Sequence, residues 1–506
     1  MAETLFYGNP ESPYRPLLEH AGCELADFMA LVHDKGVDEA LRDLRAAGVY
    51  FSFEEYKGRH PVVRGGREIP VEEGQFDNPL LTHFYRTSTS GSTGKPSKTS
   101  SGLAHLAAQS QLRILLFQAH GVLDLPFAVW RPALPSGSGL NNVMRMGRIG
   151  RPAVRWFTPL IPGEYAPALK YRLATEAAVL TARACGVDMV RPEPVGLDDA
   201  VRIAEFLADT VRREGGVCMS TTVSCGLRVA VAAREAGMDL TGVRLFVAGE
   251  PPTPAKVKGI HASGATHFSD YGAAEVGRIA LGCADPSHAT DMHVAQDLAA
   301  VILHPRLVPG SDEVVNSLHV TTLTPTMPKV LLNLEFDDFG VMEERACGCP
   351  LGSLGLNLHV REIASFRKLT GEGVTLVGSD MVHILEHVLP DRFGGSPLDY
   401  QLIQDEDERG FTRMNLVVSP SVDLESEEAV VDAVLVALAE TDVAADMARA
   451  HWAPAGSFRV VRRRPLVSAR GKQMPIRVVR DGGVSSEAAP GASPEADSGA
   501  DSEAPG

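Results

Sequence analysis

The stretch "TSTSGSTGKP", residues 87–96, decides the fold, because it concentrates hydroxyl side chains, two glycines and a lysine in one short segment. Glycine lets backbone N–H groups approach an anion, hydroxyls donate hydrogen bonds, and lysine adds positive charge. A loop that binds phosphate can therefore have this composition, although composition alone favours a linker. A flexible Ser/Gly linker has a similar composition and stays the alternative at this point.

The spacing of the segment tests two named motifs. A Walker A loop requires a glycine, four intervening residues and then Gly-Lys-Ser/Thr. Here Thr89 occupies the place of that glycine and Pro96 follows Lys95, so the Walker A motif is excluded. The Ser-x-x-Lys motif of penicillin-binding serine hydrolases is met by Ser92 and Lys95, but the chain has no Lys-Thr-Gly. A serine hydrolase stays an alternative that labelling by a β-lactam would test.

The segment resembles the phosphate-binding loop of the adenylate-forming superfamily, which has the pattern Thr-Ser-Gly-Ser/Thr-Thr-Gly-x-Pro-Lys. This superfamily includes acyl-CoA synthetases, the adenylation domains of peptide synthetases, and luciferases. The resemblance implies that the loop binds the phosphates of ATP. The residues that it assigns to ATP are Thr89, Ser90, Gly91, Ser92, Thr93, Gly94 and Lys95.

A second motif of the superfamily follows an apolar run that we expect to form a strand. The stretch "VAGEPPTP", residues 247–254, resembles the family's Gly-Glu-Pro turn, whose backbone lines the adenine. The resemblance assigns this role to Gly249, Glu250 and Pro251.

The third motif is "SDYGAAEVG", residues 269–277, which resembles the family's Tyr-Gly-x-x-Glu signature. The resemblance implies that Tyr271, followed by Gly272, stacks on the adenine. It also implies that Glu275 coordinates Mg²⁺ on the phosphates, and a hard oxygen ligand is what that ion prefers.

Two further motifs complete the family order. In "LNLEFDDFG", residues 332–340, the resemblance assigns the ribose hydroxyls to Asp338, with Asp337 as the rival. The family's preceding Tyr-Arg-Thr is replaced by Leu-Glu-Phe. Arg367 stands where the family has an arginine that also reaches the ribose, but the hinge aspartate of the family has no clear counterpart. In "PLVSARGKQMP", Lys472 would bridge the substrate carboxylate and the α-phosphate, where negative charge accumulates.

Within the superfamily, the nearest pattern is that of the phenylacetate-CoA ligase branch and the related acyl-protein synthetases. The stretches "DMHVAQD" (residues 291–297) and "CGCP" (residues 347–350) resemble the motifs of that branch. The resemblance implies a structural zinc site, because three cysteines and one histidine suit Zn²⁺ and leave no open position. Its ligands would be Cys283, His293, Cys347 and Cys349. His288 competes for the place of the histidine, and buried reduced thiols are the alternative to a metal.

The pattern of the whole chain predicts an α/β fold with two folded domains. Helical periodicity in residues 25–48 and 167–186 alternates with short apolar runs, which is typical of helices layered on a largely parallel sheet. We expect a large multi-layer adenylation domain over residues 1–365 and a small, mobile α+β domain over residues 366–482. Residues 483–506 are of low complexity and acidic, and we expect them to be disordered.

Composition excludes several classes of protein. The hydrophobic share of 44% and the charged share of 22% are typical of a globular protein with a sizeable core. The net charge of −16 argues against a general nucleic-acid binder. No long apolar run and no secretory leader occur, so we expect a cytoplasmic protein that does not bind membranes. The odd number of cysteines, seven, indicates free thiols or metal ligands.

The resemblance implies a two-step reaction that uses ATP and Mg²⁺. An aryl, arylacetic or fatty acid would be activated to an acyl-adenylate with release of pyrophosphate, and then transferred to a thiol, in the first instance that of coenzyme A. A carrier protein, an amine as acceptor, or nitrite in place of the acid would leave similar motifs. A nucleotide-binding partner protein without activity is a further alternative. The identity of the acid is not readable from the sequence, and a homodimer is compatible with it.

Overall fold

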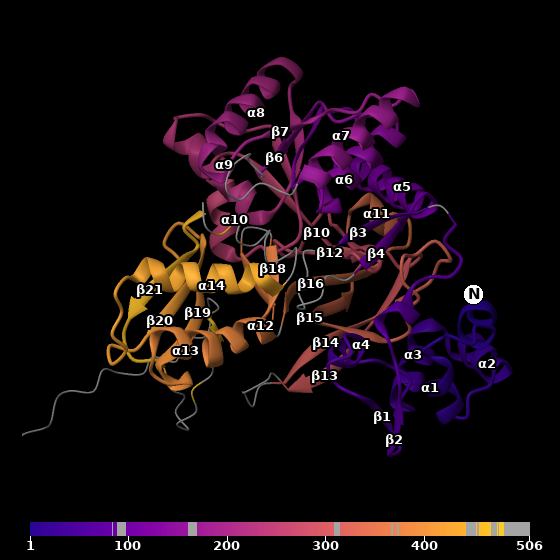
Figure 1. Ribbon diagram of the computed structural model, residues 1–506. Coiled ribbons are helices and arrows are strands. Elements are labelled where there is room, and N and C mark those ends of the chain that lie inside the picture. The colour runs from indigo at the N-terminus through magenta and orange to yellow at the C-terminus, as the bar shows by residue number, and fades with distance from the viewer. Residues whose placement is uncertain are drawn as a thin grey trace, which may run out of the picture.

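The computed structural model describes most of the chain (Figure 1). The described residues are 1–82, 84–88, 98–159, 169–307, 314–365, 368–371, 374–441, 452, 455–466, 473 and 475–479.

The N-terminal segment forms short helices, as the periodicity of residues 25–48 predicts. Gly36 ends α2 (Leu25–Lys35) and precedes α3 (Val37–Ala46) with a φ of 79°, a conformation that glycine adopts without strain. The remaining elements of this segment are η1 (Glu3–Tyr7), α1 (Arg15–His20), α4 (Phe53–Tyr56), β1 (Val62–Arg64), β2 (Arg67–Ile69) and η2 (Glu73–Phe76).

A twelve-stranded mixed sheet forms the centre of the described structure. Its strands, in spatial order, are β13 (Ala299–Leu307), β14 (Val314–Thr322), β15 (Leu334–Glu344), β16 (Leu358–Ser365), β12 (Met292–Val294), β11 (Gly277–Gly282), β10 (Thr266–Ala273), β9 (Val243–Val247), β8 (Val217–Thr221), β5 (Phe127–Trp130), β6 (Arg155–Thr158) and β7 (Pro192–Pro194). The strands from β7 to β10 pair in parallel, and those from β10 to β13 pair antiparallel. The predicted α/β class is confirmed, and parallel pairing is restricted to one half of the sheet.

Helices connect the parallel strands, as such connections require. They are α6 (Gly137–Arg148), α7 (Leu169–Ala184), η3 (Leu197–Asp199), α8 (Ala200–Glu214), α9 (Val223–Glu235) and α10 (Pro254–His261), and α5 (Leu103–Ala119) precedes β5. Alternate residues of β5 enter two different hydrophobic cores: Val129 packs into the core that contains Leu116 of α5, and Trp130 packs into the core that contains Leu207 of α8. The parallel half is therefore covered on both faces, which explains its continuous apolar runs.

A second, smaller sheet has its own core. Its strand order is β21 (Phe458–Arg462), β20 (Thr412–Val418), β19 (Tyr400–Glu406) and β22 (Ile476–Val478). The associated helices are α12 (Gly378–His383), η4 (Ile384–Val388), α13 (Leu389–Phe393), η5 (Pro397–Asp399) and α14 (Glu427–Thr441), and β17 (Lys368–Gly371) pairs with β18 (Val374–Val377). This unit, in orange and yellow in Figure 1, confirms a small α+β part. The boundary predicted near residue 366 stays a prediction.

Polar contacts join the smaller unit to α10. The ammonium of Lys256 is buried and lies 3.4 Å from a carboxylate oxygen of Glu406, at the end of β19. Thr253 donates a hydrogen bond to the same carboxylate at 2.7 Å. The tip of the β19–β20 hairpin is therefore anchored beside the turn that carries the Gly-Glu-Pro motif.

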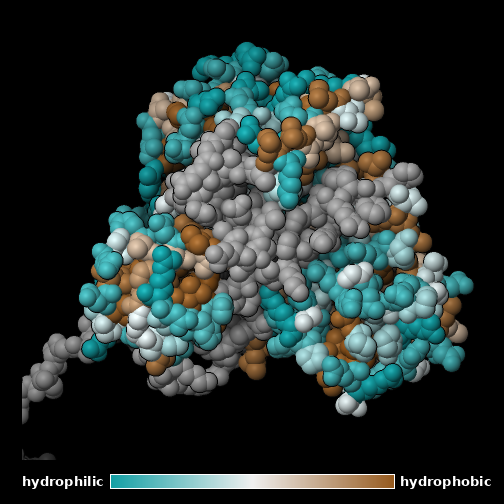
Figure 2. Space-filling model, in the orientation of Figure 1, coloured by the Kyte–Doolittle hydropathy of each residue, from teal (hydrophilic) through white to brown (hydrophobic). Residues whose placement is uncertain are grey.

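Hydrophilic residues cover much of the described surface on the face shown in Figure 2, and hydrophobic residues form separate patches between them. Among the described helices, none combines the length and the apolar character that a membrane span needs.

Candidate active site and metal centre

Tyr271 and Asp338 come from different motifs, and the structure brings them into contact. The hydroxyl of Tyr271, on β10, donates a hydrogen bond of 2.8 Å to Oδ2 of Asp338, on β15. Ser365, at the end of β16, donates to the other carboxylate oxygen. Burial, followed by the negative charge of Asp338, raises the pKa of Tyr271 well above its usual value. The tyrosine therefore stays protonated and keeps donating to the carboxylate.

The rival aspartate has a different environment. Asp337 is fully buried, has a φ of 59°, and lies 3.5 Å from the guanidinium of Arg306. Arg306 also forms an ion pair with Glu335. The carboxylate of Asp337 is thus held by structural charges, whereas that of Asp338 faces Tyr271. The geometry favours Asp338 for the ribose role, which stays a prediction.

Glu275 lies in the turn between β10 and β11, beside a lysine that sequence reasoning missed. Its Oε1 is 3.8 Å from Nζ of Lys57, which also lies 3.1 Å from Glu73 and 4.5 Å from the centre of the Tyr56 ring. The side chain of Lys57 is only 5% exposed. The ammonium of Lys57 orients the carboxylate of Glu275, and carboxylate oxygens are ligands that Mg²⁺ prefers. Nothing in the sequence around Lys57 marks it, because its carboxylate partners, Glu73 and Glu275, come from other segments.

The Gly-Glu-Pro turn follows β9 as predicted, but the side chain of Glu250 has a structural task. It accepts hydrogen bonds from the backbone N–H of Ser224 at 2.7 Å and from its hydroxyl at 2.6 Å, at the N-terminal end of α9. Lys256 lies 3.4 Å from the same carboxylate. Gly249 has a φ of 97°, which a side chain would oppose. Only the backbone of this turn, which includes Pro251, is therefore left to line an adenine.

Gly272 is required by a close approach of two strands. A Cβ at this position would lie 2.4 Å from the carbonyl oxygen of Gly277 on β11. The register of the β10–β11 pair shifts between Tyr271 and Gly272. The glycine after Tyr271 thus allows the bulge that turns the end of β10.

Nine of the predicted site residues lie outside the described residues, and their assignments stay predictions. They are Thr89, Ser90, Gly91, Ser92, Thr93, Gly94, Lys95, Arg367 and Lys472. The described strands on either side of the phosphate loop, β3 (Phe84–Ser88) and β4 (Lys98–Gly102), pair antiparallel, with Ser88 opposite Lys98. The loop therefore connects the two strands of a hairpin, which places its ends together.

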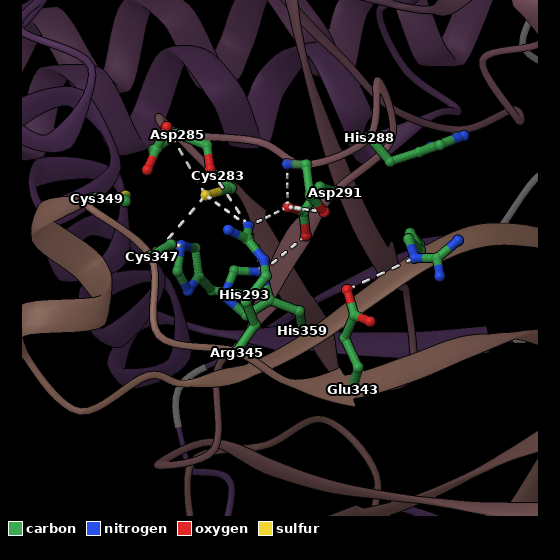
Figure 3. Close-up of polar contacts among 12 residues, drawn as sticks. Cys283, Asp285, His288, Asp291, His293, Glu343, Arg345, Cys347, Cys349 and His359 are labelled. Carbon is green, nitrogen blue, oxygen red and sulfur yellow. Dashed lines mark hydrogen bonds and ion pairs between the residues drawn. The ribbon is translucent and has the colours of Figure 1, made fainter.

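The four predicted zinc ligands converge (Figure 3), and we call them the metal centre: Cys283, His293, Cys347 and Cys349. Their donor atoms all lie within 4.8 Å of one another. Sγ of Cys347 is 3.9 Å from Sγ of Cys283 and 3.7 Å from Nε2 of His293. Zinc–sulfur bonds of about 2.3 Å in a tetrahedron place two sulfurs about 3.8 Å apart. The donor set and its spacing therefore fit Zn²⁺.

Neighbouring groups orient these donors. Nδ1 of His293 donates to the carbonyl of Leu356 at 2.6 Å, so Nε2 is the free ligand atom. The amide N–H groups of Ala284 and Asp285 donate to the sulfurs of Cys349 and Cys283, each at 3.4 Å. Hydrogen bonds, first of all from Cys283, lower the pKa of Cys349, and the same contact raises the pKa of Cys283.

The rival histidine lies elsewhere. The side chain of His288 is 41% exposed and lies 3.3 Å from Glu362. Beside the metal centre, Asp291 accepts from Arg345 and lies 2.7 Å from Nδ1 of His359. Asp291 and His359 form a second group of possible ligands with Cys283. The ion pair with Arg345 occupies Asp291, so the Cys₃His set is the better metal site.

A solved enzyme structure has a similar architecture. No protein-family model matches the chain, and no curated protein matches it. The structure of a 2-hydroxyisobutyryl-CoA ligase in complex with 2-HIB-AMP and CoA is similar over 94% of this chain and 87% of that chain, at 16% identity and a TM-score of 0.55. An amide bond synthetase from Marinactinospora thermotolerans is similar over 92% of this chain and 91% of that chain, at 13% identity and a TM-score of 0.44. The first of these similarities extends over nearly the whole chain, which therefore has the fold of the adenylate-forming enzymes.

Proposed function

We propose that this protein is an ATP-dependent ligase that activates a small acid as its adenylate and releases pyrophosphate. The observation that carries the proposal is the hydrogen bond between Tyr271 and Asp338. Two motifs that the resemblance assigns to one nucleoside lie 67 positions apart in the chain and meet at this contact. Tyr271 would hold the adenine and Asp338 the ribose hydroxyls, which a carboxylate binds by accepting both O–H groups.

In the first half-reaction, an oxygen of the acid attacks the α-phosphorus of ATP. The bond between this phosphorus and the oxygen bridging to the β-phosphate breaks, and pyrophosphate leaves with the electron pair. Positioning and stabilisation of charge supply the catalysis, because no protein nucleophile is needed. The phosphate loop would hold the β- and γ-phosphates, and Lys472 would lie between the acid and the α-phosphate. Mg²⁺ would offset phosphate charge, with Glu275 as its carboxylate and Lys57 keeping that carboxylate in place.

In the second half-reaction, a thiolate attacks the activated carbon and AMP leaves. We propose coenzyme A as the acceptor, with a carrier-protein thiol or an amine as the variants to test. The partners of the protein would then be small molecules, its location the cytoplasm, and a homodimer stays a prediction.

The metal centre would hold one Zn²⁺ in a structural role. The support is the convergence of four donors on one point and the absence of an open position in a Cys₃His set. Such an ion links β11 and β12 to the segment before α11 (Pro350–Ser353). The ion would supply none of the groups that the two half-reactions need.

The test is pyrophosphate release by the purified full chain with ATP, Mg²⁺ and a panel of acids that includes nitrite, with and without coenzyme A. Lys472→Ala should abolish acid-dependent release while ATP binding is nearly unchanged, and exposed Lys258→Ala is the control. Asp338→Asn should weaken ATP binding by about tenfold or more, because it removes a charged acceptor. The surface variant Asp209→Asn should bind ATP normally. Acid-dependent pyrophosphate release by the Lys472→Ala variant would refute the assignment of that lysine. The absence of pyrophosphate release by the unmodified chain with every acid tested would refute the proposed function.

A further inference from the structure

Four arginines gather where α5 and α6 meet the strands of the large sheet, and we call them the arginine cluster: Arg113, Arg131, Arg145 and Arg278. Arg113, on α5, is 1% exposed, and Arg131, directly after β5, is 8% exposed. The side chain of Arg278, on β11, is 10% exposed. Arginine is almost never buried without a paired charge, so this arrangement needs an explanation.

Several N–H donors of the cluster have no acceptor among the described residues. Arg113 donates through Nη2 to Asn142 at 2.9 Å, but its Nε and Nη1 have no partner among the described residues. Within the same part of the chain, Nη1 of Arg278 and Nε2 of Gln109 also have none. A buried N–H group that makes no hydrogen bond costs free energy. Among the described residues, Oδ1 of Asp270 is an unpaired acceptor in the same place, but the unpaired donors outnumber it, and this surplus indicates a bound acceptor.

Charge gives the sign of that acceptor. Among the charged groups that act on Arg113, the carboxylate is Asp270, which lies 2.8 Å from Nη2 of Arg278. Burial, followed by Arg278, holds the pKa of Arg113 well below its usual value. Guanidinium nevertheless stays protonated in proteins. The carboxylate of Glu250 contributes little to balancing the charge of Arg131, because Ser224 and Lys256 already bind it. Arg113, Arg131 and Arg278 together therefore carry more positive charge than the carboxylate of Asp270 balances.

The cluster adjoins the candidate adenylation site. Oε1 of Gln109 accepts from the backbone N–H of Arg278 at 3.0 Å, which ties α5 to β11. A Cβ on Gly277 would lie 2.8 Å from Nε2 of Gln109, so the helix touches the β10–β11 turn. The same turn carries Glu275, and Asp270 directly precedes Tyr271. A group held by Arg113 would thus lie close to the proposed site of ATP.

We infer that Arg113, Arg278 and Gln109 bind a planar anion with two oxygen atoms. The guanidinium fork matches such an anion in shape and charge, and Gln109 adds a donor. This inference rests on the proposed function and names its substrate class: nitrite, or a short acid with a second carboxylate. It differs from the aryl or fatty acid that the family resemblance implies, because an apolar chain would leave the buried donors unpaired.

The first experiment measures nitrite binding to the full chain by calorimetry, without ATP, with chloride at the same ionic strength as the reference. Arg113→Met should weaken nitrite binding by about tenfold or more, because a charged hydrogen-bond donor is lost. Asp270→Asn should tighten binding, because it removes the carboxylate that opposes the anion. Arg202→Met, on the exposed face of α8, is the matched control and should bind nitrite as the unmodified chain does.

The opposite effects of Arg113→Met and Asp270→Asn separate a binding role from a structural one. If the cluster were purely structural, both substitutions would lower the free energy of unfolding. The affinity for nitrite would then not depend on which charge is removed. Circular dichroism checks that each variant folds, and Arg278→Gln replaces Arg113→Met if the latter does not. Unchanged nitrite affinity in a folded Arg113 or Arg278 variant would overturn the inference.

The second experiment measures pyrophosphate release with nitrite, glutarate and valerate. Release with nitrite identifies the small anion as the substrate, and release with glutarate but not valerate identifies a dicarboxylic acid; both support the inference. Equal release with valerate in the unmodified chain and in Arg113→Met would overturn it and leave the proposed function standing. Nitrite binding that depends on Arg113, without release from any acid, would support the subsite and refute the proposed function.

Discussion

The metal centre and the arginine cluster lie at the two ends of β11 and bury polar groups in opposite ways. At Cys283, directly after β11, lone pairs converge, and neighbouring groups orient the donor atoms of Cys283, Cys349 and His293. At Arg278, near its start, positive charges gather and several N–H groups lack described partners. Buried polar groups require partners. Converging sulfurs therefore indicate a cation, and a surplus of unpaired guanidinium N–H groups indicates an anion.

The largest expected effect is at the metal centre. Cys349→Ser should remove the bound metal and lower the free energy of unfolding by several kcal/mol, because structural zinc binding contributes directly to folding. Metal content by mass spectrometry and urea denaturation measure the two effects. Cys185→Ser is the control, since Cys185 is exposed and lies outside the centre. A chain that is purified without zinc, and that is equally stable after the substitution, would show that the cysteines are only buried thiols.

The arginine cluster should respond with the opposite sign. Without a bound anion, Arg113→Met should leave the free energy of unfolding unchanged or raise it by up to about 2 kcal/mol. Replacing a buried charge by an apolar side chain of similar volume is often neutral or stabilising. Urea denaturation in the absence of nitrite measures the effect, with Arg202→Met as the surface control. A loss of stability as large as that of Cys349→Ser would mean that both regions are structural.

The smallest expected effect concerns His105, on α5 beside the cluster. Burial and then the charge of Arg145 lower the pKa of His105 to about 4, whereas it is near 6.5 in the unfolded chain. The unfolded state therefore binds more protons between these values, and stability falls as the pH drops from about 6.5 to about 4. His105→Gln should reduce this dependence by up to about 1.4 kcal/mol per pH unit.

Stability measured against pH, with His288→Gln as the exposed control, tests this effect. Saturating nitrite should raise the pKa of His105, because an anion offsets the charge of Arg145. Identical pH dependence in the unmodified chain and in His105→Gln would contradict the prediction. A pKa of His105 that does not respond to nitrite would place the anion away from the cluster.

Local pattern predicted the parts of the molecule that depend on neighbours in the sequence. The periodicity of residues 25–48 predicted α2 and α3, and the apolar run before Gly249 predicted β9. Motif order predicted the adenylate-forming fold. The mixed pairing of the sheet was not predicted, because a strand of similar composition can pair in either direction, and only the connection and the register decide which.

The site shows the same division. Tyr271 and Asp338 were assigned separately from their motifs, but their mutual hydrogen bond follows from the sheet that brings β10 and β15 to one region. Lys57 and Ser365 carried no signal, because an ammonium or a hydroxyl gains its role only from the partner that faces it. The sequence already preferred Asp338 to Asp337, and the contacts with Tyr271 and Arg306 give that preference a physical reason.

By itself, the sequence determined the α/β class and the order of the motifs, since spacing along the chain encodes both, and it offered three cysteines as candidate metal ligands. The tertiary structure alone decided which histidine joins the cysteines, and it assembled Arg113, Arg131 and Arg278 from three separate segments. The physical reason is that the burial and electrostatic environment of a side chain depend on the residues that surround it in the folded protein. An arginine that looks like a surface residue in the sequence becomes a ligand-binding group only when the fold removes it from water.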